Sequence, residues 1–267
     1  MEEFQITEMM QLIKVNRDKN IGKVLLIVEG LSTEFYLLHR IFTRIFNYQF
    51  EKLDRMLKYG KFNEQEGIQS SVFVINTKES AISFIKDTDE FLESMFEKLI
   101  EEYQFPVDRA AIFYIFDRDV NSNTDTVLIR DLLRSLSSSR ENNGFNRQGL
   151  LLLSYPSVES FVASNFIENT FNLSFGTGDE LKRYLNDQKI NQCKITEESI
   201  KSAVIEMDYA LKQVGVTEYN LDHFSDTNLF IFNTQEEKYI LYQNYRLLSL
   251  LCVILLDLGL IEVIDSE

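Results

Sequence analysis

Short, nearly continuous runs of apolar residues alternate in this chain with longer segments whose apolar residues recur every three or four positions. The short runs are typical of strands covered on both faces, and the longer spacing is typical of helices with one apolar face. Strands are predicted at 24–28, 71–76, 110–116 and 150–154. Because strands that alternate with helices pair in parallel through right-handed crossovers, the pattern predicts an α/β fold.

The segments between these strands predict helices, with two exceptions. The charged, glycine-bearing segment 51–69 is expected to be a loop or a partly helical insertion, and the polar segment 137–149 a mobile loop. The helices are expected at 4–15, 35–46, 79–103, 126–136 and 155–166.

The pattern changes near residue 170, after which helices alone are expected, including a strong one over 235–258. The predicted organisation is therefore an α/β domain over 1–170, with its core at 23–165, and a helical C-terminal subdomain over 171–267.

Acidic residues stand where two of the predicted strands end. Glu29 follows the first strand, and Asp117 and Asp119 follow the third. The carboxyl ends of parallel strands form the edge of an α/β sheet where ligands bind, so we expect the three carboxylates to converge if the strands are neighbours. Alternation in an extended chain would place Asp117 and Asp119 on one side, facing a hard cation such as Mg²⁺.

These acids lie in motifs that resemble a known family. The segment "VEGLSTE" (28–34) resembles the acidic first motif of the TOPRIM superfamily, and "IFDRD" (115–119) resembles its Asp-x-Asp second motif. The resemblance spans roughly 23–165 and implies a Rossmann-like parallel sheet of about four strands flanked by helices. It also implies that the cofactor is Mg²⁺ or Mn²⁺ and that the activity is phosphodiester cleavage or transfer. By the same resemblance, Glu29 would be a metal ligand or general acid/base, and Asp117 and Asp119 would be metal ligands.

A further acidic motif narrows the resemblance. The segment "SYPSVESF" (154–161) is similar to one in stand-alone, defence-associated TOPRIM proteins such as the RloB-like group and the nucleases of overcoming-lysogenization systems. Glu159 would then be another metal ligand, completing a site for two ions about 4 Å apart. The resemblance implies a cytoplasmic nuclease in anti-phage defence, or abortive infection, that acts with a partner ATPase on DNA or on RNA such as tRNA.

Structural alternatives exist for each acid. Glu29 and Glu159 could each stand at a helix start simply because the helix dipole favours an acid there. Glu34, in the first turn of the following helix, is expected to be a secondary residue of the site, as is Asp125. The segment 117–128 also begins like a calcium loop, but it lacks the glycine and the final glutamate that such a loop requires.

Four basic residues receive separate predictions. Arg140 and Arg147, in the polar loop, are predicted to contact nucleic acid, with a solvated loop as the alternative for each. Arg118 is expected to point away from its aspartate neighbours and to have a surface role. His39 is expected to be a structural histidine packed in its helix among apolar neighbours.

Composition limits the remaining choices. The 267 residues are 45% apolar, and 42 acidic against 27 basic residues give a formal charge of −15, which opposes broad contact with a phosphate backbone. Two cysteines and two histidines are too few for a zinc site or a disulfide framework. The acidic N-terminus and an apolar run of only ten residues at 247–256 predict a cytoplasmic protein without a membrane segment.

These limits favour a small nuclease over the larger TOPRIM enzymes. The chain has no room for the tyrosine-bearing domain of a topoisomerase, no zinc module of a primase, and no Gly-x-x-x-x-Gly-Lys run for nucleotide hydrolysis. The alternatives are an RNA-processing ribonuclease and a non-catalytic TOPRIM binding module. The sequence leaves the oligomeric state open, with a homodimer as one alternative.

Overall fold

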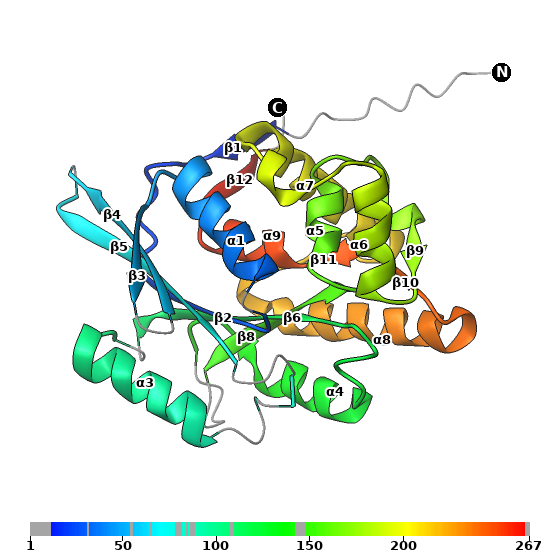
Figure 1. Ribbon diagram of the computed structural model, residues 1–267, viewed down its shortest axis with the longest axis horizontal. Coiled ribbons are helices and arrows are strands. Elements are labelled where there is room, and N and C mark those ends of the chain that lie inside the picture. The colour runs from blue at the N-terminus through cyan, green and yellow to red at the C-terminus, as the bar shows by residue number, and fades with distance from the viewer. Residues whose placement is uncertain are drawn as a thin grey trace.

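A computed structural model describes residues 12–30, 32–53, 56–64, 66–77, 82–83, 85, 89–106, 109–141 and 148–264. Arg147, residues 4–11 of the first expected helix and most of residues 79–88 lie outside these ranges. An eight-stranded sheet crosses the described part of the chain, with helices on both of its faces (Figure 1). The α/β prediction is confirmed at this level.

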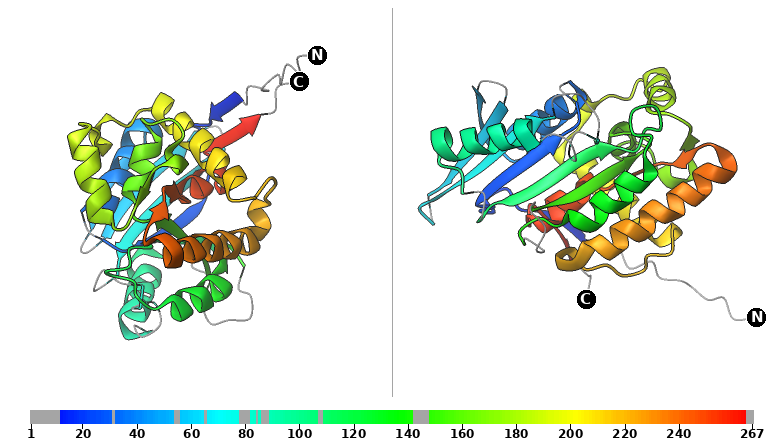
Figure 2. Two further views of the ribbon diagram at one scale, coloured as in Figure 1. Left: turned by 90° about the vertical axis from the view of Figure 1, so that its right-hand side faces the viewer. Right: turned by 90° about the horizontal axis from the view of Figure 1, so that it is seen from below.

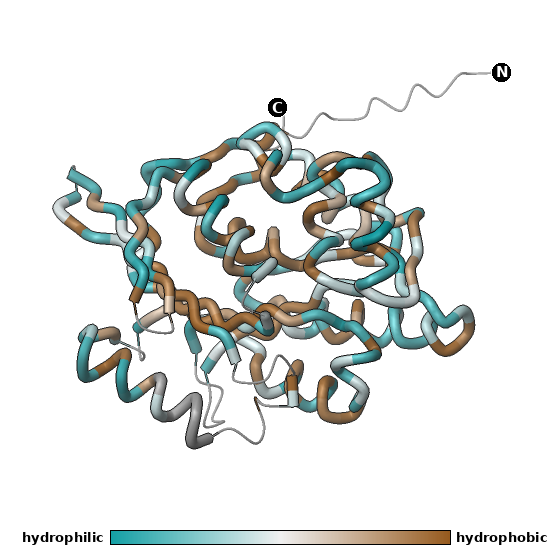
Figure 3. The backbone as a smooth tube through the Cα atoms, viewed as in Figure 1, coloured by the Kyte–Doolittle hydropathy of each residue, from teal (hydrophilic) through white to brown (hydrophobic). Residues whose placement is uncertain are grey.

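Four parallel strands form the centre of the sheet, at the positions where the sequence predicts them. They pair in the order β5, β2, β6, β8, so that Leu26 of β2 lies level with Val74 of β5 and Phe113 of β6. Helices cover both faces, and the apolar runs form the hydrophobic band in the middle of Figure 3. The strands are β2 (Lys23–Val28), β5 (Ile68–Asn76), β6 (Ala111–Asp117) and β8 (Gly149–Tyr155).

Antiparallel strands extend the sheet at both edges. Beyond β5 lie β4 (Met56–Asn63) and β3 (Gln49–Leu53), so the prediction of a loop or helical insertion over 51–69 is wrong. The charged residues misled the prediction because β3 is an edge strand whose side chains stay largely exposed. The short strand β7 (Ser137–Ser138) pairs with the start of β8.

The part beyond residue 170 contains strands as well as helices, contrary to prediction. The helix expected over 235–258 is in fact α8 (Phe224–Tyr242), ended by Gln243 in the left-handed conformation (φ 55°) and followed by strands and a second helix. Strand β11 joins the main sheet antiparallel to β8, which explains the apolar run 247–256. The later elements are β9 (Ser174–Phe175), β10 (Tyr245–Arg246), β11 (Leu248–Ser249), α9 (Leu251–Asp257) and β12 (Ile261–Ile264).

The N-terminal segment also differs from its prediction. Residues 12–15 form strand β1 (Leu12–Val15), not the end of a helix, and β1 pairs antiparallel with β12. The two strands lie side by side, as both the labels in Figure 1 and the left view in Figure 2 show. This four-residue strand forms its backbone hydrogen bonds with a partner 246 to 252 positions away, which local periodicity does not reveal.

Helices form a layer on each side of the sheet. Helices α3 and α4 lie below it in Figure 1, and α1, α5, α6, α7 and α9 lie above it. Helix α8 packs against α4. None of the described helices combines the length and apolar character needed to cross a bilayer. The helices are α1 (Thr33–Arg40, continued by a π-helical turn, Ile41–Ile45), α3 (Asp89–Tyr103), α4 (Thr126–Ser135), α5 (Glu159–Ser164), α6 (Gly178–Asp187) and α7 (Glu197–Gln213), with 3₁₀ turns at Thr170–Asn172, Gln192–Lys194 and Leu221–His223.

Candidate active site at the carboxyl edge of the sheet

Glu29 and Asp117 meet where the neighbouring strands β2 and β6 end. Strand β2 stops at Val28 and β6 stops at Asp117 itself, so both acids lie at the carboxyl edge of the sheet. The backbone N–H of Asp117 donates a 2.8 Å hydrogen bond to Oε2 of Glu29. The structure therefore brings together two acids that are 88 positions apart in the sequence.

Two further glutamates face the same edge. Asp117 Oδ1 accepts a 2.7 Å hydrogen bond from the N–H of Val158, which places the start of α5, and with it Glu159, beside Asp117. Glu34, in the first turn of α1, accepts a 3.2 Å hydrogen bond from the N–H of Gly30. A Cβ on Gly30 would lie 2.7 Å from the Glu34 carboxylate, so this close approach requires glycine.

The buried acids raise one another's pKa. Burial is the main cause for Glu29, whose pKa rises to about 7; hydrogen bonds from Asp117 and Asn123 oppose the rise, and the charge of Glu34 adds to it. Burial, followed by the charges of Glu29, Glu159 and Glu34, raises the pKa of Asp117 well above its usual range. The pKa of Glu34 is raised by burial and by Glu159. These carboxylates form one electrostatically coupled acidic cluster: Glu29, Glu34, Asp117 and Glu159.

Asp119 is held differently from Asp117. Because β6 ends at Asp117, strand alternation does not extend to Asp119, whose Oδ2 accepts a 3.0 Å hydrogen bond from the N–H of Gly178 at the start of α6. Its Oδ1 accepts a 2.9 Å bond from Asn121. A Cβ on Gly178 would come within 3.1 Å of Asp119 Oδ2, so a glycine permits this contact. The chain beyond residue 170 thus reaches the acidic edge of the sheet.

Asn123 is a site residue that sequence reasoning missed. Its Nδ2 donates to the backbone carbonyl of Asp117 at 2.7 Å and lies 3.3 Å from each oxygen of Glu29, while its Oδ1 accepts the N–H of Ile82 at 2.8 Å. Asn123 is fully buried and orients the Glu29 carboxylate. Its position in the calcium-like stretch 117–128 was the available signal.

The calcium-loop alternative finds no support in these contacts. The side-chain oxygens of Asp119 and Asn123 accept hydrogen bonds from different backbone amides, as described above. Asp125 is the N-cap of α4 and accepts from the N–H groups of Val127 and Leu128, so it serves the helix, not the acidic cluster.

Lys182 of α6 is the second residue that the sequence did not reveal. Its Nζ lies 3.7 Å from Oε1 of Glu159, whose Oε2 accepts a 2.7 Å hydrogen bond from the Ser157 hydroxyl. Burial opposes the charge on Lys182, but nearby acids, Glu159 first and Asp117 next, raise its pKa above the ordinary value. Within the described residues, Lys182 is the one cation within ion-pairing distance of the acidic cluster.

Arg118 is buried and not at the surface, which corrects its predicted role. Its side chain is 1% exposed and forms a two-point ion pair with Glu236 of α8, with Nε and Nη2 at 2.7 and 2.8 Å from the carboxylate. Its Nη1 donates to the Asn123 carbonyl, and Glu236 Oε1 also accepts a 3.0 Å hydrogen bond from the Tyr245 hydroxyl. The expectation that Arg118 points away from the acids was sound, but its partner lies in another part of the chain.

The basic residues predicted to contact nucleic acid do not lie at the acidic edge. Arg140 follows β7, which pairs with the first residues of β8, and therefore lies toward the opposite edge of the sheet. It is paired there with Asp257, at 2.7 Å. His39 is half-buried and packs edge-on against Phe50, with ring centroids 4.7 Å apart, in agreement with a packed histidine.

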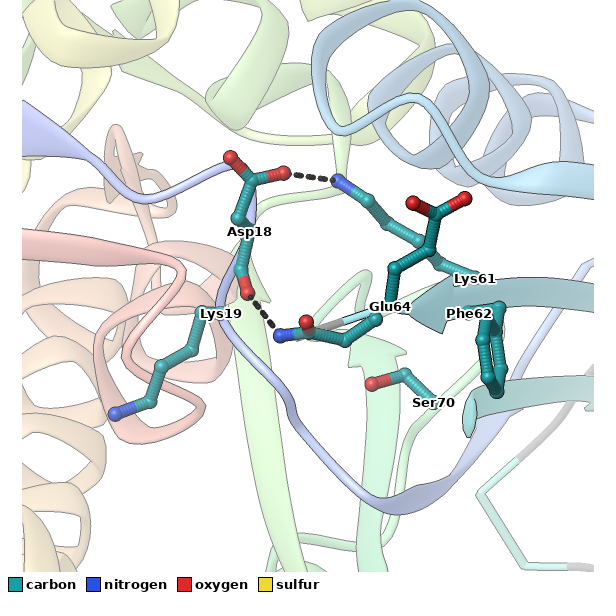
Figure 4. Close-up of a pocket in the computed structure, with 7 residues that line it drawn as sticks. Asp18, Lys19, Lys61, Phe62, Glu64 and Ser70 are labelled. Carbon is teal, nitrogen blue, oxygen red and sulfur yellow. Dashed lines mark hydrogen bonds and ion pairs between the residues drawn. The ribbon is translucent and has the colours of Figure 1, made fainter. Parts of the chain in front are cut away.

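A polar pocket of about 340 Å³ occupies the opposite edge of the sheet, near the start of β5 (Figure 4). Lys61 is held there by Asp18 at 3.2 Å and by the Phe46 carbonyl at 3.1 Å. The Lys61 charge is paired with Asp18, and lysines and acids alternate around the pocket, so it differs in chemistry from the acidic cluster.

The acidic cluster fits a hard divalent cation by the chemistry of its donors. Carboxylate oxygens are the preferred protein ligands of Mg²⁺ and Mn²⁺, and a cation would relieve the repulsion that raises the pKa values of Glu29, Glu34 and Asp117. Within the described ranges, no three Asp, Glu, His or Cys side chains are already gathered as ligands of one ion. The metal roles of Glu29, Asp117, Asp119 and Glu159 stay predictions.

Comparison of the chain with protein-family models, with curated proteins and with solved structures finds no match.

Proposed function

We propose that this protein is a Mg²⁺- or Mn²⁺-dependent nuclease that hydrolyses phosphodiester bonds at the carboxyl edge of its sheet. The acidic cluster is the observation that supports the proposal. Glu29, Glu34 and Glu159 are at most 7% exposed, and their negative charges together with Asp117 exceed the single positive charge of Lys182. A fold that only needed stability would not concentrate unneutralised buried acids, because each costs solvation energy.

Asp117 and Glu159 are the residues that would hold the cation, beside Glu29. Asp119, whose Oδ2 accepts the Gly178 N–H, is a further candidate ligand. A bound Mg²⁺ would stabilise negative charge on the phosphate oxygens and lower the pKa of the attacking water.

Glu29 is suited to move the proton. Its Oε2 accepts the Asp117 N–H, and both of its oxygens lie 3.3 Å from Asn123 Nδ2. In the metal-free protein its pKa is raised to about 7, where a general acid/base works well at neutral pH. Asn123 fixes the plane of this carboxylate, and Lys182 would add positive charge toward a non-bridging phosphate oxygen.

A role in anti-phage defence beside a partner ATPase, with DNA or an RNA such as tRNA as target, is part of the same proposal. It is supported by the resemblance of "VEGLSTE", "IFDRD" and "SYPSVESF" to defence-associated TOPRIM proteins. The alternatives of an RNA-processing ribonuclease and of a binding module predict different outcomes in the following test.

The test measures cleavage of single-stranded and duplex DNA and RNA with Mg²⁺, Mn²⁺ or EDTA. Asp117→Asn and Glu29→Gln should each lower the cleavage rate by roughly 100-fold or more. Asp131→Asn, an exposed acid of α4 paired with Arg134, is the matched control and should cleave like wild type. Cleavage that survives EDTA, or that Asp117→Asn retains, would reject the proposal, and binding without cleavage would favour the binding module.

A further inference from the structure

A groove beside the acidic cluster carries aromatic side chains on both walls and a lysine on one of them. The groove encloses about 550 Å³ between α1 and the β3–β4 hairpin. Tyr36 and His39 line it from the helix, and Phe50 and Lys52 line it from β3. Tyr36 and Phe50 are 44% and 43% exposed, so their rings are available to a ligand.

The groove opens at the same edge of the sheet as the acidic cluster. Ser32, which also lines it, follows Glu29 by three positions. On the hairpin side, Met56 pairs with Ile75 of β5, and Ile75 pairs with Ile27 of β2. The lining residue Met56 is therefore level with the strand position two residues before Glu29, and a ligand in the groove would extend from the acidic cluster along α1.

The aromatic wall is rigid. The Phe50 ring packs against His39 at 4.7 Å and against Tyr59 at 5.5 Å between ring centroids, and Tyr59 is buried behind it. A ring held in this way presents its remaining surface in a fixed orientation, so little conformational entropy is lost when a planar group stacks on it.

The charge of the groove differs from that of the whole chain. Strand alternation turns Phe50 and Lys52 toward α1 and turns Glu51 to the opposite face, where it pairs with Lys58 at 2.8 Å. No acid lines the groove among the described residues. Arg44 of the α1 side adds positive charge, which together with burial, the larger cause, lowers the pKa of His39.

We propose that this groove binds single-stranded nucleic acid and presents it to the acidic cluster. Exposed aromatic rings stack on unpaired bases, and neighbouring cations contact the phosphates, which is the combination that single-strand binding requires. Bases paired within a duplex cannot reach such rings. The inference rests on the proposed function, since it names the substrate class of the nuclease.

Binding is measured by fluorescence anisotropy with labelled DNA and RNA oligonucleotides of about 12 nucleotides and mixed sequence, each alone and as a duplex. The full chain carries Asp117→Asn, and the buffer contains Ca²⁺, so that the oligonucleotides stay intact. Single strands should bind more tightly than duplexes. Phe50→Ala and Tyr36→Ala should each weaken single-strand binding by roughly 5- to 150-fold, and Lys52→Gln should weaken it and flatten its salt dependence.

Two matched controls lie on the same hairpin outside the groove. Phe62→Ala removes an aromatic residue that is 61% exposed at the opposite edge, and Lys58→Gln removes a lysine of the opposite face. Both should bind like the parent chain. Equal affinity in all variants, equal losses in the controls, tighter binding of duplexes, or no binding at all would overturn the proposal, the last outcome pointing to a protein ligand for the groove.

A second readout separates this inference from the proposed function. Hydrolysis of the small diester bis(p-nitrophenyl) phosphate needs the acidic cluster but not the groove, so otherwise wild-type Phe50→Ala and Tyr36→Ala chains should keep that activity. Small-diester hydrolysis with oligonucleotide affinity unchanged by these substitutions would reject the groove and keep the nuclease. Groove-dependent binding without any hydrolysis would reject the nuclease and keep the groove as a binding site.

Discussion

Asp117 and Arg118 are neighbours in the chain, but Arg118 lies beside a group of opposite charge and Asp117 lies beside groups of like charge. Arg118 faces α8, where Glu236, the Asn123 carbonyl and the Tyr245 hydroxyl form a complete set of contacts around one ion pair. Asp117 faces three glutamates and has a backbone amide, from Val158, as its hydrogen-bond donor. One residue step thus separates a buried cation paired with a carboxylate from a half-buried carboxyl group that faces other acids.

The difference indicates which charged residues stabilise the fold. A buried ion pair with all of its contacts satisfied joins two elements, here the end of β6 and α8, and loses much stability if one partner is removed. A cluster of like charges weakens the fold and is retained only where a ligand uses it. The comparison predicts opposite responses to substitution on the two sides of the chain.

The largest effect is expected at the ion pair. Arg118→Met leaves Glu236 buried without its cation and should lower the free energy of unfolding by about 3–5 kcal/mol. Urea unfolding followed by circular dichroism measures the change. The double variant Arg118→Met/Glu236→Leu should recover most of the loss, and a double variant as unstable as the single one would contradict the comparison.

On the acidic side, substitution should stabilise the metal-free protein. The pKa of Glu29 rises from 4.5 in its ordinary state to about 7 in the fold, so the folded state binds the extra proton between these values and loses stability as pH rises through them. Glu29→Gln removes this loss and should make the protein more stable than wild type at pH 8 by up to about 3 kcal/mol. At pH 4.5 the two should be similar. Unfolding in urea with EDTA at both pH values measures the difference, and a variant destabilised equally at both would contradict the pKa of Glu29.

Divalent cations should raise the free energy of unfolding by binding to the acidic cluster. At a concentration of 100 times its Kd, Mn²⁺ should add about 2.7 kcal/mol to the free energy of unfolding of wild type. The same titration of Asp117→Asn should give a much smaller increase, and Asp131→Asn should match wild type. Differential scanning fluorimetry detects the shift, and equal shifts in all three proteins would place the cation elsewhere.

The smallest effect is expected for Lys182. Its side chain is 47% exposed, so solvent screening limits the contribution of its contact with Glu159, and Lys182→Gln should destabilise the metal-free protein by less than about 1 kcal/mol. The variant should gain more stability from Mn²⁺ than wild type does, because the acidic cluster has lost its own cation. A smaller gain would mean that Lys182 does not compete with a bound cation.

The sequence predicted the centre of the sheet because strands that are buried on both faces are nearly continuous runs of apolar residues. The runs 24–28, 71–76, 110–116 and 150–154 became β2, β5, β6 and β8. Strand β3 is exposed at the edge and β4 beside it is only partly buried, so neither is a continuous apolar run, and the segment 51–69 was taken for a loop or a partly helical insertion. Strand β11 was hidden within a predicted helix because a two-residue strand satisfies its backbone through a distant partner, β8.

The sequence likewise predicted only part of the candidate site. The motifs around Glu29 and Asp117 identified the acids, and parallel neighbouring strands brought them together as expected. Gly178 and Lys182 reach the edge only through folding of a separate segment, so their spacing from Glu29 contained no information, whereas Asn123 lies six positions after Asp117 in a stretch already singled out. Arg118 was misplaced for the same reason, since its partner Glu236 lies 118 positions away.

Two carboxylates of this edge whose pKa is raised, Glu29 and Asp117, accept hydrogen bonds from the backbone N–H groups of Asp117 and Val158. Because a proton bonded to a carboxylate senses its ionisation directly, these amides are native spectroscopic probes. In a ¹⁵N-resolved NMR titration, the Asp117 resonance follows Glu29 and the Val158 resonance follows Asp117. The order in which the two acids lose their protons is thereby accessible without attaching a reporter group to either side chain.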